Sequence, residues 1–568
     1  MVNSLARPDS HRWLLGTLLF VLFRAIPNLS YPIGRDQASF LVIGEGLLRG
    51  QRLYRDLWDI KPPGIYGVYA VLSKLFGHVM WSVGFVDILW LLVISYCIFR
   101  FTERYMGTVA AGLTVAVNAS WHCANGYLVA AQAECFLMLL VFAGYLLVAG
   151  EGRWQAARDL AAGLCLGGGF WLKYNALAFL PLLALVPYLD WSGLNLRPRR
   201  LRLAIPRGEW FRRVGVLIAG ILLAFGVVMA YFGLTGSWAA FKEGHLAIAA
   251  RYAVAPGRIP GFWTVAAARV LLGLGGWTLL ATGVSFLIPE WCDLSQLLPV
   301  ASAATMGFVA TCSQFRFFPY SFETCRPFFA AIWGYLAWRI YNGLRGLTRQ
   351  PDRRWMTRLL ACALLAVIAL GPLRMEAKTF VQRYRDLAWW RRDSRDFFAR
   401  YPDVRASVER LEGQSQMIDL LRRCSVPGDG VFIWGTAPLI YYMTGLRPPT
   451  RFVVTNHPLI SPWGPPVWRD ELVRDLEKSP PAFLVVAQGD AVPDIALHAL
   501  DSEQYLARYP SLSEFISSSY NRVADLPSFV LYSRKPPPQN QSIARSPGGP
   551  VSSAVHTCSP QTSSEEMR

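Results

Sequence analysis

The sequence predicts a polytopic α-helical membrane protein that ends in a small α/β domain. Hydrophobic residues make up 53% of the 568 residues and charged residues only 17%, against roughly 45–50% and 25% in average soluble domains. The apolar excess lies in blocks before about residue 373, and residues 374–568 account for only +2 of the net charge of +18. This pattern excludes an ordinary soluble enzyme, a disordered protein and a small disulfide scaffold. Basic residues between apolar runs indicate membrane topology, not nucleic acid binding.

About eleven apolar segments are candidates for membrane-spanning helices, since a bilayer core needs around 20 mostly apolar residues per helix. They lie at residues 13–29, 80–99, 107–122, 134–150, 159–172, 175–190, 214–232, 263–288, 295–312, 327–341 and 358–373. We therefore expect residues 1–373 to form a transmembrane domain.

The orientation follows from basic residues in the loops. Arginines gather at residues 100–104, 153–158, 197–213 and 339–358, and Arg7 and Arg12 precede the first span. Because such loops face the cytoplasm, the N-terminus is expected inside, and the loop 30–79 and the C-terminal domain outside. The sequence thus predicts a multi-pass protein of the bacterial inner membrane.

The remaining residues divide into three parts. Residues 374–430 alternate charges and aromatic side chains, which is typical of a helical connector, and residues 431–535 are expected to form an extracytoplasmic α/β domain. Its strands are predicted at 430–435, 482–487 and 529–532, with helices at 438–443 and 468–478. The tail 536–568 is rich in Pro, Ser and Gln and is expected to be disordered.

The first outer loop, residues 30–79, contains the most distinctive motif. It opens with Gly34-Arg35-Asp36-Gln37 and continues through Tyr54-Arg55-Asp56 to Asp59-Ile60-Lys61-Pro62-Pro63-Gly64. Around fifty residues is too long for a plain connector. Apolar residues at helical spacing in 40–48 and 65–72 predict two short amphipathic helices in the membrane interface.

This motif resembles the first periplasmic loop of the lipid-linked-sugar glycosyltransferases of the GT-C fold. The resemblance is to their bacterial ArnT-like and PMT-like branch, the dolichyl-phosphate-mannose–protein mannosyltransferase superfamily. Three further stretches agree with it: 133–136, which contains Glu134, the glycine-rich 167–174 with Lys173, and 316–320. The resemblance covers roughly residues 13–345, and 431–487 more weakly. Gln37 departs from the pattern, because many relatives have Asp-Glu where this chain has Asp36-Gln37.

The resemblance implies an enzyme that transfers a sugar, with inversion, from a polyprenyl-phosphate carrier in the lipid bilayer. The acceptor would be lipopolysaccharide, another polysaccharide, a lipid or a protein. Asp36 would be the catalytic base toward the acceptor hydroxyl. Cations would stabilise the leaving phosphate, and the implied substrate-binding residues are Lys61, Asp56, Asp59, Glu134, Lys173, Arg316 and Tyr320. No cofactor, no divalent metal and no nucleic acid partner is expected.

Structural roles remain open for the first-loop acids. Asp36 would also suit the N-cap of a helix that starts at Gln37, because aspartate is a favoured capping residue. Asp56 and Asp59 could instead be solvated loop carboxylates or ion-pair partners of neighbouring basic residues.

The other charged candidates have structural alternatives as well. Glu134 could be solvated at the membrane boundary, and Lys173 could extend its ammonium to the interface as an anchor. Arg316 could stack on Phe317.

Two other function classes share these features: a transporter or flippase of lipid-linked glycans, and a non-catalytic lipid-binding scaffold. Transport is typically associated with ionisable residues near mid-membrane, often on the interrupted helices of repeated halves. Here the acidic residues gather at the outer interface and no internal repeat is visible, which favours the enzyme.

The ten cysteines are scattered, mostly inside apolar runs. No CxxC pair and no Cys/His spacing typical of zinc ligands occurs. The sequence therefore predicts no structural zinc site, and the cysteines are expected to be small buried apolar side chains.

Overall fold

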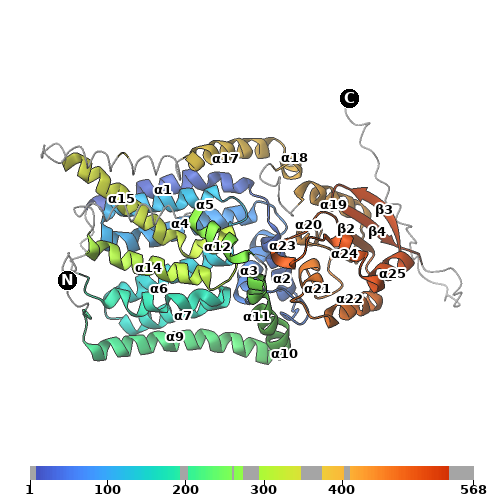
Figure 1. Cartoon of the computed structure of the whole chain (residues 1–568), viewed down its shortest axis with the longest axis horizontal. Helices are drawn as coiled ribbons and strands as arrows, with labels where there is room; N and C mark the ends of the chain where they lie inside the picture. The colour runs from blue at the N-terminus through green and yellow to red at the C-terminus, as the bar shows by residue number, and fades with distance from the viewer. Residues whose placement is uncertain are drawn as a thin grey trace.

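The computed structural model of the chain describes residues 8–191, 202–258, 261–272, 293–346, 362, 374–401 and 410–536. Long helices lie side by side at one end of the molecule, and a small sheet with its own short helices forms the other end (Figure 1). Between the two ends lie short helices of the first outer loop and of the segment that follows the helix 207–234.

The helical bundle contains, within the described ranges, α1 (Pro8–Ala25), α4 (Ser82–Met106), α5 (Thr108–Ala124), α6 (Ala133–Ala149), α7 (Gln155–Leu172), α9 (Arg207–Leu234), α14 (Leu294–Cys312) and α15 (Arg326–Gly346). Each coincides with a predicted span. Four segments of the described chain are long and apolar enough to cross a bilayer: Asp9–Ser30, Ser82–Met106, Arg207–Leu234 and Leu294–Cys312. The chain thus has the build of a multi-pass membrane protein.

The predicted span 175–190 is not one continuous helix. It consists of η2 (Tyr174–Phe179), α8 (Leu180–Ala184) and η3 (Val186–Tyr188). Pro181 and Pro187 lack a backbone N–H and interrupt the helical hydrogen bonds. The predicted span 263–288 is described only as far as α12 (Phe262–Leu272), and 358–373 lies outside the described residues apart from Cys362.

Glycines bring α7 and α9 into close contact. A Cβ atom at Gly163 would lie 2.0 Å from the carbonyl oxygen of Leu217, and one at Gly220 would lie 2.2 Å from that of Leu160. Neither position has room for a side chain. Small residues at such crossings let membrane helices pack backbone against backbone.

The first outer loop folds into the two predicted helices, α2 (Arg35–Leu48) and α3 (Gly64–Phe76). They cross at Gly44, where a Cβ atom would lie 2.6 Å from the backbone nitrogen of Ala70. Most of α2 is buried, so this helix is covered by protein on more than one side. The close crossing fixes the polar start of α2 relative to the segment that precedes α3.

Further outer segments and the connector surround this loop. After α9 come α10 (Trp238–Phe241), the π-helix Lys242–Leu246, α11 (Ala247–Val254) and η5 (Ala255–Arg258), and η7 (Pro319–Thr324) precedes α15. The indole N–H of Trp58 donates to the Gly244 carbonyl of the π-helix at 2.5 Å. The helical connector consists of α17 (Arg374–Arg392), which contacts the end of α1 at Phe23 (Figure 1), α18 (Ser394–Ala399) and α19 (Leu411–Cys424).

The C-terminal unit is built on a four-stranded sheet of order β1-β2-β4-β3. The strands β1 (Val431–Trp434) and β2 (Phe483–Ala487) are parallel and fully buried, and β3 (Tyr520–Leu526) and β4 (Phe529–Arg534) complete it in antiparallel fashion. Its helices are α20 (Pro438–Thr444), α21 (Asn456–Ile460), α22 (Val467–Lys478), α23 (Pro493–Ala496), α24 (Ser502–Leu506) and α25 (Pro510–Ser519). The predicted strands and helices are present, whereas β3 was not predicted.

The C-terminal unit is docked on the first outer loop. The Trp58 backbone N–H donates to the Arg451 carbonyl at 2.7 Å, and the indole of Trp58 lies edge-on to Trp468, with ring centroids 4.8 Å apart. The Tyr442 hydroxyl donates to the Gly77 carbonyl at the end of α3. These contacts place α21 and its neighbours over the polar start of α2.

Candidate functional site

Asp36 lies in the first turn of α2, at the boundary between the helical bundle and the C-terminal unit. The helix begins at Arg35, its N-cap is Gly34, and no side chain caps it. Asp36 is therefore not an N-cap residue, and the capping alternative is wrong. Its side chain is 17% exposed and is held by cations, with Arg35 Nε 3.5 Å from Oδ1.

Lys61 pairs with Asp36 across the first outer loop. Its ammonium Nζ lies 3.2 Å from Asp36 Oδ2. Burial by itself would raise the pKa of Asp36, but the charges of Lys61 and Arg35 lower it overall, to about 2. Asp36 is thus ionised at neutral pH, as a proton acceptor must be. The structure brings together the two residues that the motif singles out.

Tyr320 and a second ion pair lie beside the first. Tyr320, on η7, has its ring centroid 5.1 Å from Lys61 Nζ and 5.8 Å from Lys173 Nζ. Lys173 pairs with Glu134 at 2.8 Å and donates to the Gln314 side-chain carbonyl at 3.0 Å. Glu134 is fully buried and paired, so it is not solvated, and Lys173 points into the protein. Two ammonium groups therefore flank one aromatic ring.

Asp59 is the second carboxylate of the site. Its Oδ1 accepts a hydrogen bond from the backbone N–H of Ile60 at 2.6 Å. Burial raises the pKa of Asp59 to about 6, although the nearby Lys61 opposes this shift. Asp36 and Asp59 thus differ widely in proton affinity within one site, an arrangement typical of sites that use two carboxylates in different roles.

A pocket lies between the first outer loop and the C-terminal unit. Asp36, Asp59 and Lys61 line it from the loop, Tyr252 and Tyr320 from other outer segments, and the C-terminal unit contributes Val454, His457, Pro458, Trp463 and Ile495. The Nε2 atom of His457 is buried and has no hydrogen-bond partner among the residues that the structure describes. Burial, together with the charges of Arg35 and Arg316, lowers the pKa of His457 well below its usual value, so its imidazole is neutral.

Two predicted binding residues are held in other contacts. Asp56 accepts from the backbone N–H of Arg52 at 2.8 Å and pairs with its guanidinium at 3.2 Å, within the loop itself. Arg316 stacks on Tyr252, 3.8 Å from the ring centroid, not on Phe317. Its guanidinium donates to the carbonyl of Tyr252 at 2.8 Å and to that of Asp494 at 2.5 Å. Arg316 thus ties the C-terminal unit to the bundle.

Gln37, the departure from the pattern of many relatives, has a clear structural role. Its side-chain amide donates to the carbonyl of Tyr127 at 3.1 Å and to that of Ala130 at 2.9 Å. A glutamate could not donate these bonds. The amide fixes the segment between α5 and α6 against the turn that carries Asp36.

The sequence prediction missed most of the pocket lining, including its polar and aromatic residues Arg35, Tyr252, His457 and Trp463. Arg35 is adjacent to Asp36, so a search for cations beside the motif would have found it. His457 and Trp463 lie in the C-terminal unit, and no local pattern connects them with residues 36–61.

Comparison with known proteins agrees with the predicted resemblance. Residues 60–206 match the family model of the dolichyl-phosphate-mannose-protein mannosyltransferases. The fold is similar to that of ArnT from Cupriavidus metallidurans bound to undecaprenyl phosphate, at 14% identity and a TM-score of 0.53, over 93% of this chain and 98% of ArnT. No curated protein sequence matches the chain.

A more distant structural match is the archaeal oligosaccharyltransferase AglB from Archaeoglobus fulgidus in complex with an inhibitory peptide and a dolichol-phosphate. It is 10% identical with a TM-score of 0.43, over 85% of this chain and 70% of AglB. The fold assignment rests on ArnT, whose similarity extends over nearly the whole of both chains. The chain therefore has the GT-C fold of the ArnT-like and PMT-like membrane proteins.

Proposed function

We propose that the chain is a membrane glycosyltransferase that moves a sugar from a polyprenyl-phosphate carrier to an acceptor of the cell envelope. The observation that carries this proposal is the Asp36–Lys61 ion pair, 3.2 Å long, in a pocket between the helical bundle and the C-terminal unit. In this pair Asp36 would accept the proton of the acceptor hydroxyl, and Lys61 would bind the phosphate of the donor. The similar ArnT structure contains undecaprenyl phosphate, which supports a donor of this class.

The reaction would proceed by a single displacement. The oxygen of the acceptor hydroxyl forms a bond to the anomeric carbon, and its proton passes to the Asp36 carboxylate. The bond between the anomeric carbon and the phosphate oxygen breaks, and its electron pair leaves with the lipid phosphate. Lys61 stabilises the departing phosphate by a charge-assisted hydrogen bond. One displacement inverts the configuration at the anomeric carbon.

Donor binding would also strengthen the base. In the structure the ammonium of Lys61 forms an ion pair with Asp36, and its charge helps to hold the pKa of that carboxyl at about 2. A donor phosphate competes for the same ammonium. When Lys61 turns toward the phosphate, Asp36 loses its nearest cation and its affinity for a proton rises. The two residues would thus exchange an internal ion pair for two contacts with substrate.

Further residues would complete the donor site. Lys173 and Tyr320 lie next to Lys61 and suit contacts with the phosphate, and Asp59 suits contact with the sugar. Glu134 would orient Lys173 through their ion pair. Catalysis would need neither a cofactor nor a divalent metal at this pocket. Asp56 and Arg316 would stabilise the loop and the C-terminal unit, given the contacts that occupy them.

The pocket would face the periplasm of a bacterial inner membrane, with the N-terminus in the cytoplasm. Arginine-rich loops support this orientation. An outward-facing site gives access to lipopolysaccharide, other polysaccharides, lipids or proteins as acceptors.

The test compares envelope glycans and lipids by mass spectrometry in a strain that lacks the protein and in strains complemented with variants. Wild type restores a sugar modification. Asp36→Asn, produced at the same level, does not restore it, while the purified variant still binds undecaprenyl phosphate. Glu514→Gln, on the exposed side of α25, is the matched control and restores the modification fully. A fully active Asp36→Asn protein would refute the assignment of the base.

A further inference from the structure

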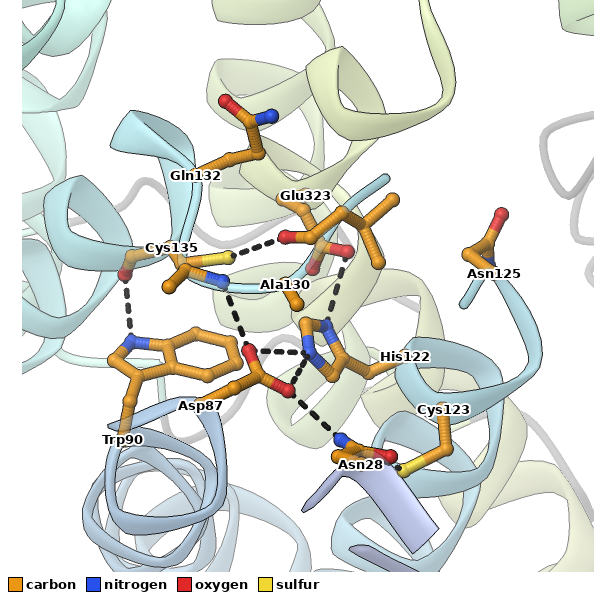
Figure 2. Close-up of polar contacts among 12 residues, drawn as sticks. Asn28, Asp87, Trp90, His122, Cys123, Asn125, Ala130, Gln132, Cys135 and Glu323 are labelled. Atoms are coloured by element: carbon orange, nitrogen blue, oxygen red, sulfur yellow. Dashed lines mark hydrogen bonds and ion pairs between the residues drawn. The ribbon is translucent and has the colours of Figure 1, made fainter. Parts of the chain in front are cut away.

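A second group of ionisable side chains is buried among the helices, apart from the pocket. Asp87 belongs to α4, His122 to α5 and Cys135 to α6, while Glu323 lies on η7. Figure 2 shows these side chains turned toward one another. Each is at most 2% exposed. The group lies near the ends of α4, α5 and α6 that adjoin the first outer loop, and the reaction proposed above does not use it.

The imidazole of His122 lies between two carboxylates. Its Nε2 atom is 3.1 Å from Asp87 Oδ1, and its Nδ1 atom is 3.2 Å from Glu323 Oε1. A neutral imidazole has only one N–H, so one of these two contacts has no hydrogen to share. The contact with Asp87 is fixed by further donors, since Asn28 and the Ala131 backbone N–H also donate to that carboxylate at 2.8 and 2.9 Å. The Glu323 side is therefore where a further cation fits.

The charges of the buried side chains also indicate a place for a further cation. The cluster contains two carboxylates, Asp87 and Glu323, and one guanidinium, that of Arg326, which contacts Glu323. Among the described residues of the cluster, the carboxylates thus outnumber the guanidinium by one, and a cation at the imidazole, either a proton or a metal ion, restores the balance. Burying an uncompensated charge is costly unless a cation accompanies it.

We propose that His122, Cys135 and Glu323 supply three of the four ligands of a zinc site. Their ligand atoms, the imidazole Nδ1, the thiol Sγ and a carboxylate oxygen, all lie within 4.8 Å of one another. Zinc bonds of about 2.0–2.2 Å at a tetrahedral angle place a nitrogen and an oxygen ligand about 3.3 Å apart. The observed Nδ1–Oε1 separation of 3.2 Å already fits. The Cys135 thiol, which donates to the Val129 carbonyl at 3.3 Å, would turn from that carbonyl toward the metal, and Arg326 would share the Glu323 carboxylate with it.

Asp87 completes the arrangement as the partner of a metal-ligating histidine. Such histidines almost always donate their other ring N–H to a carboxylate or carbonyl, which fixes the tautomer. Here Nε2–H faces Asp87, which leaves the Nδ1 lone pair for the metal. Zinc binding releases the Cys135 thiol proton to solvent. The Zn²⁺ ion, the thiolate, the two carboxylates and the Arg326 guanidinium together carry no net charge.

The site would join elements that carry residues of the pocket. Glu323 lies three residues after Tyr320 on η7, and Cys135 directly follows Glu134 at the start of α6. A metal at this point would fix η7 against α5 and α6. It would thereby also hold in place the ring of Tyr320 on η7 and the Glu134–Lys173 ion pair, both of which lie beside Lys61. The ligands come from three separate elements, which is why no spacing in the sequence indicates them. The proposal stands against the sequence-based expectation of no structural zinc, and it does not depend on the proposed transfer reaction.

The test measures zinc in the purified full-length protein by inductively coupled plasma mass spectrometry, with an affinity tag that contains no histidine. Wild type, prepared without chelator, is expected to contain about one zinc ion per chain. His122→Gln and Cys135→Ser lose most of it. Cys97→Ser removes another buried cysteine of the bundle and keeps the metal. Elution volume and helical circular dichroism establish that each preparation is folded.

A second measurement needs no variant. Wild type loaded with Co²⁺ in place of zinc should show a thiolate-to-metal charge-transfer band. Folded wild-type protein without zinc, after growth and purification with zinc present, would overturn the proposal in favour of a hydrogen-bonded cluster around a protonated His122. Zinc retained in both ligand variants, or bound cobalt without the thiolate band, would overturn it as well.

Discussion

Lys61 and Asp36 form an ion pair that closes the first outer loop, with Nζ 3.2 Å from Oδ2 and both side chains largely buried. The two residues lie at opposite ends of a loop segment that contains α2, and the crossing of α2 and α3 at Gly44 brings them together. A ligand that draws the ammonium away from Asp36 therefore removes the nearest cation from that carboxylate.

Replacement of Lys61 by methionine should weaken the binding of a short-chain prenyl phosphodiester about 30-fold, because a charge-assisted contact of about 2 kcal/mol is lost. Isothermal titration calorimetry on detergent-solubilised protein measures this change. Lys74→Met, on the exposed side of α3, is the matched control and should bind as wild type does. Equal affinities for Lys61→Met and wild type would remove Lys61 from the phosphate site.

Binding of the same phosphodiester should depend on pH through Asp59. The pKa of Asp59 is raised to about 6 by burial, so this carboxyl is charged above pH 6 and neutral below it. The ligand keeps one negative charge throughout, Asp36 stays ionised and His457 stays neutral. Loss of the negative charge on Asp59 removes a repulsion, and affinity should rise about tenfold from pH 7.5 to pH 5.

Asp59→Asn is the control for this dependence. It should bind the phosphodiester equally well at both pH values, with the affinity that wild type reaches at pH 5. A wild-type affinity that does not change with pH would show that the charge of Asp59 does not act on the bound phosphate.

Much of the fold follows from local patterns in the sequence. Long apolar runs between arginine-rich loops predict α4 and α9 to within several residues, since hydropathy over about 20 residues outweighs single positions. The prediction fails at residues 175–190, where Pro181 breaks a run that is apolar throughout. It also misses β3, because the exposed residues Asn521, Arg522 and Asp525 interrupt the apolar pattern of this strand.

The candidate site was predictable only in part. The motif singles out Asp36 and Lys61, and both line the pocket. It does not separate Asp56 from Asp59, because the course of an irregular loop decides which carboxylate turns inward. His457 enters the pocket through the docking of a distant unit, and such long-range contacts have no signature in a single sequence.

His457 should contact the carbohydrate, since its Nε2 atom is buried beside the pocket and finds no hydrogen-bond partner in the described part of the chain. A hydroxyl of the substrate would satisfy this atom. His457→Phe keeps the ring volume but removes the hydrogen bond, and should lower kcat/KM about tenfold, which corresponds to about 1.4 kcal/mol. Undecaprenyl phosphate, which has no sugar, should bind this variant as tightly as wild type.

The matched control is His11→Phe on the exposed side of α1. It should leave both kcat/KM and lipid phosphate binding unchanged. If His457→Phe instead weakened undecaprenyl phosphate binding, the imidazole would belong to the phosphate site.

Cysteine labelling tests the orientation. Glu514→Cys, on the exposed side of α25, should react with a membrane-impermeant maleimide in intact spheroplasts, and Arg153→Cys, between α6 and α7, should react only after lysis. Wild-type protein provides the background from native cysteines. The reverse pattern would place the pocket in the cytoplasm.

Gln37→Glu should destabilise this chain. The amide of Gln37 donates to the carbonyls of Tyr127 and Ala130, and Gln37 is only 1% exposed. A carboxylate there faces two carbonyl oxygens and has no hydrogen to donate, so we expect a loss of about 1–3 kcal/mol in the free energy of unfolding. Thermal unfolding in detergent measures it as a lower Tm. Gln504→Glu serves as the control, because glutamate suits the capping box that starts at Asp501. An unchanged Tm for Gln37→Glu would mean that the segment between α5 and α6 can turn its carbonyls away, and that the amide does not fix the turn that carries Asp36.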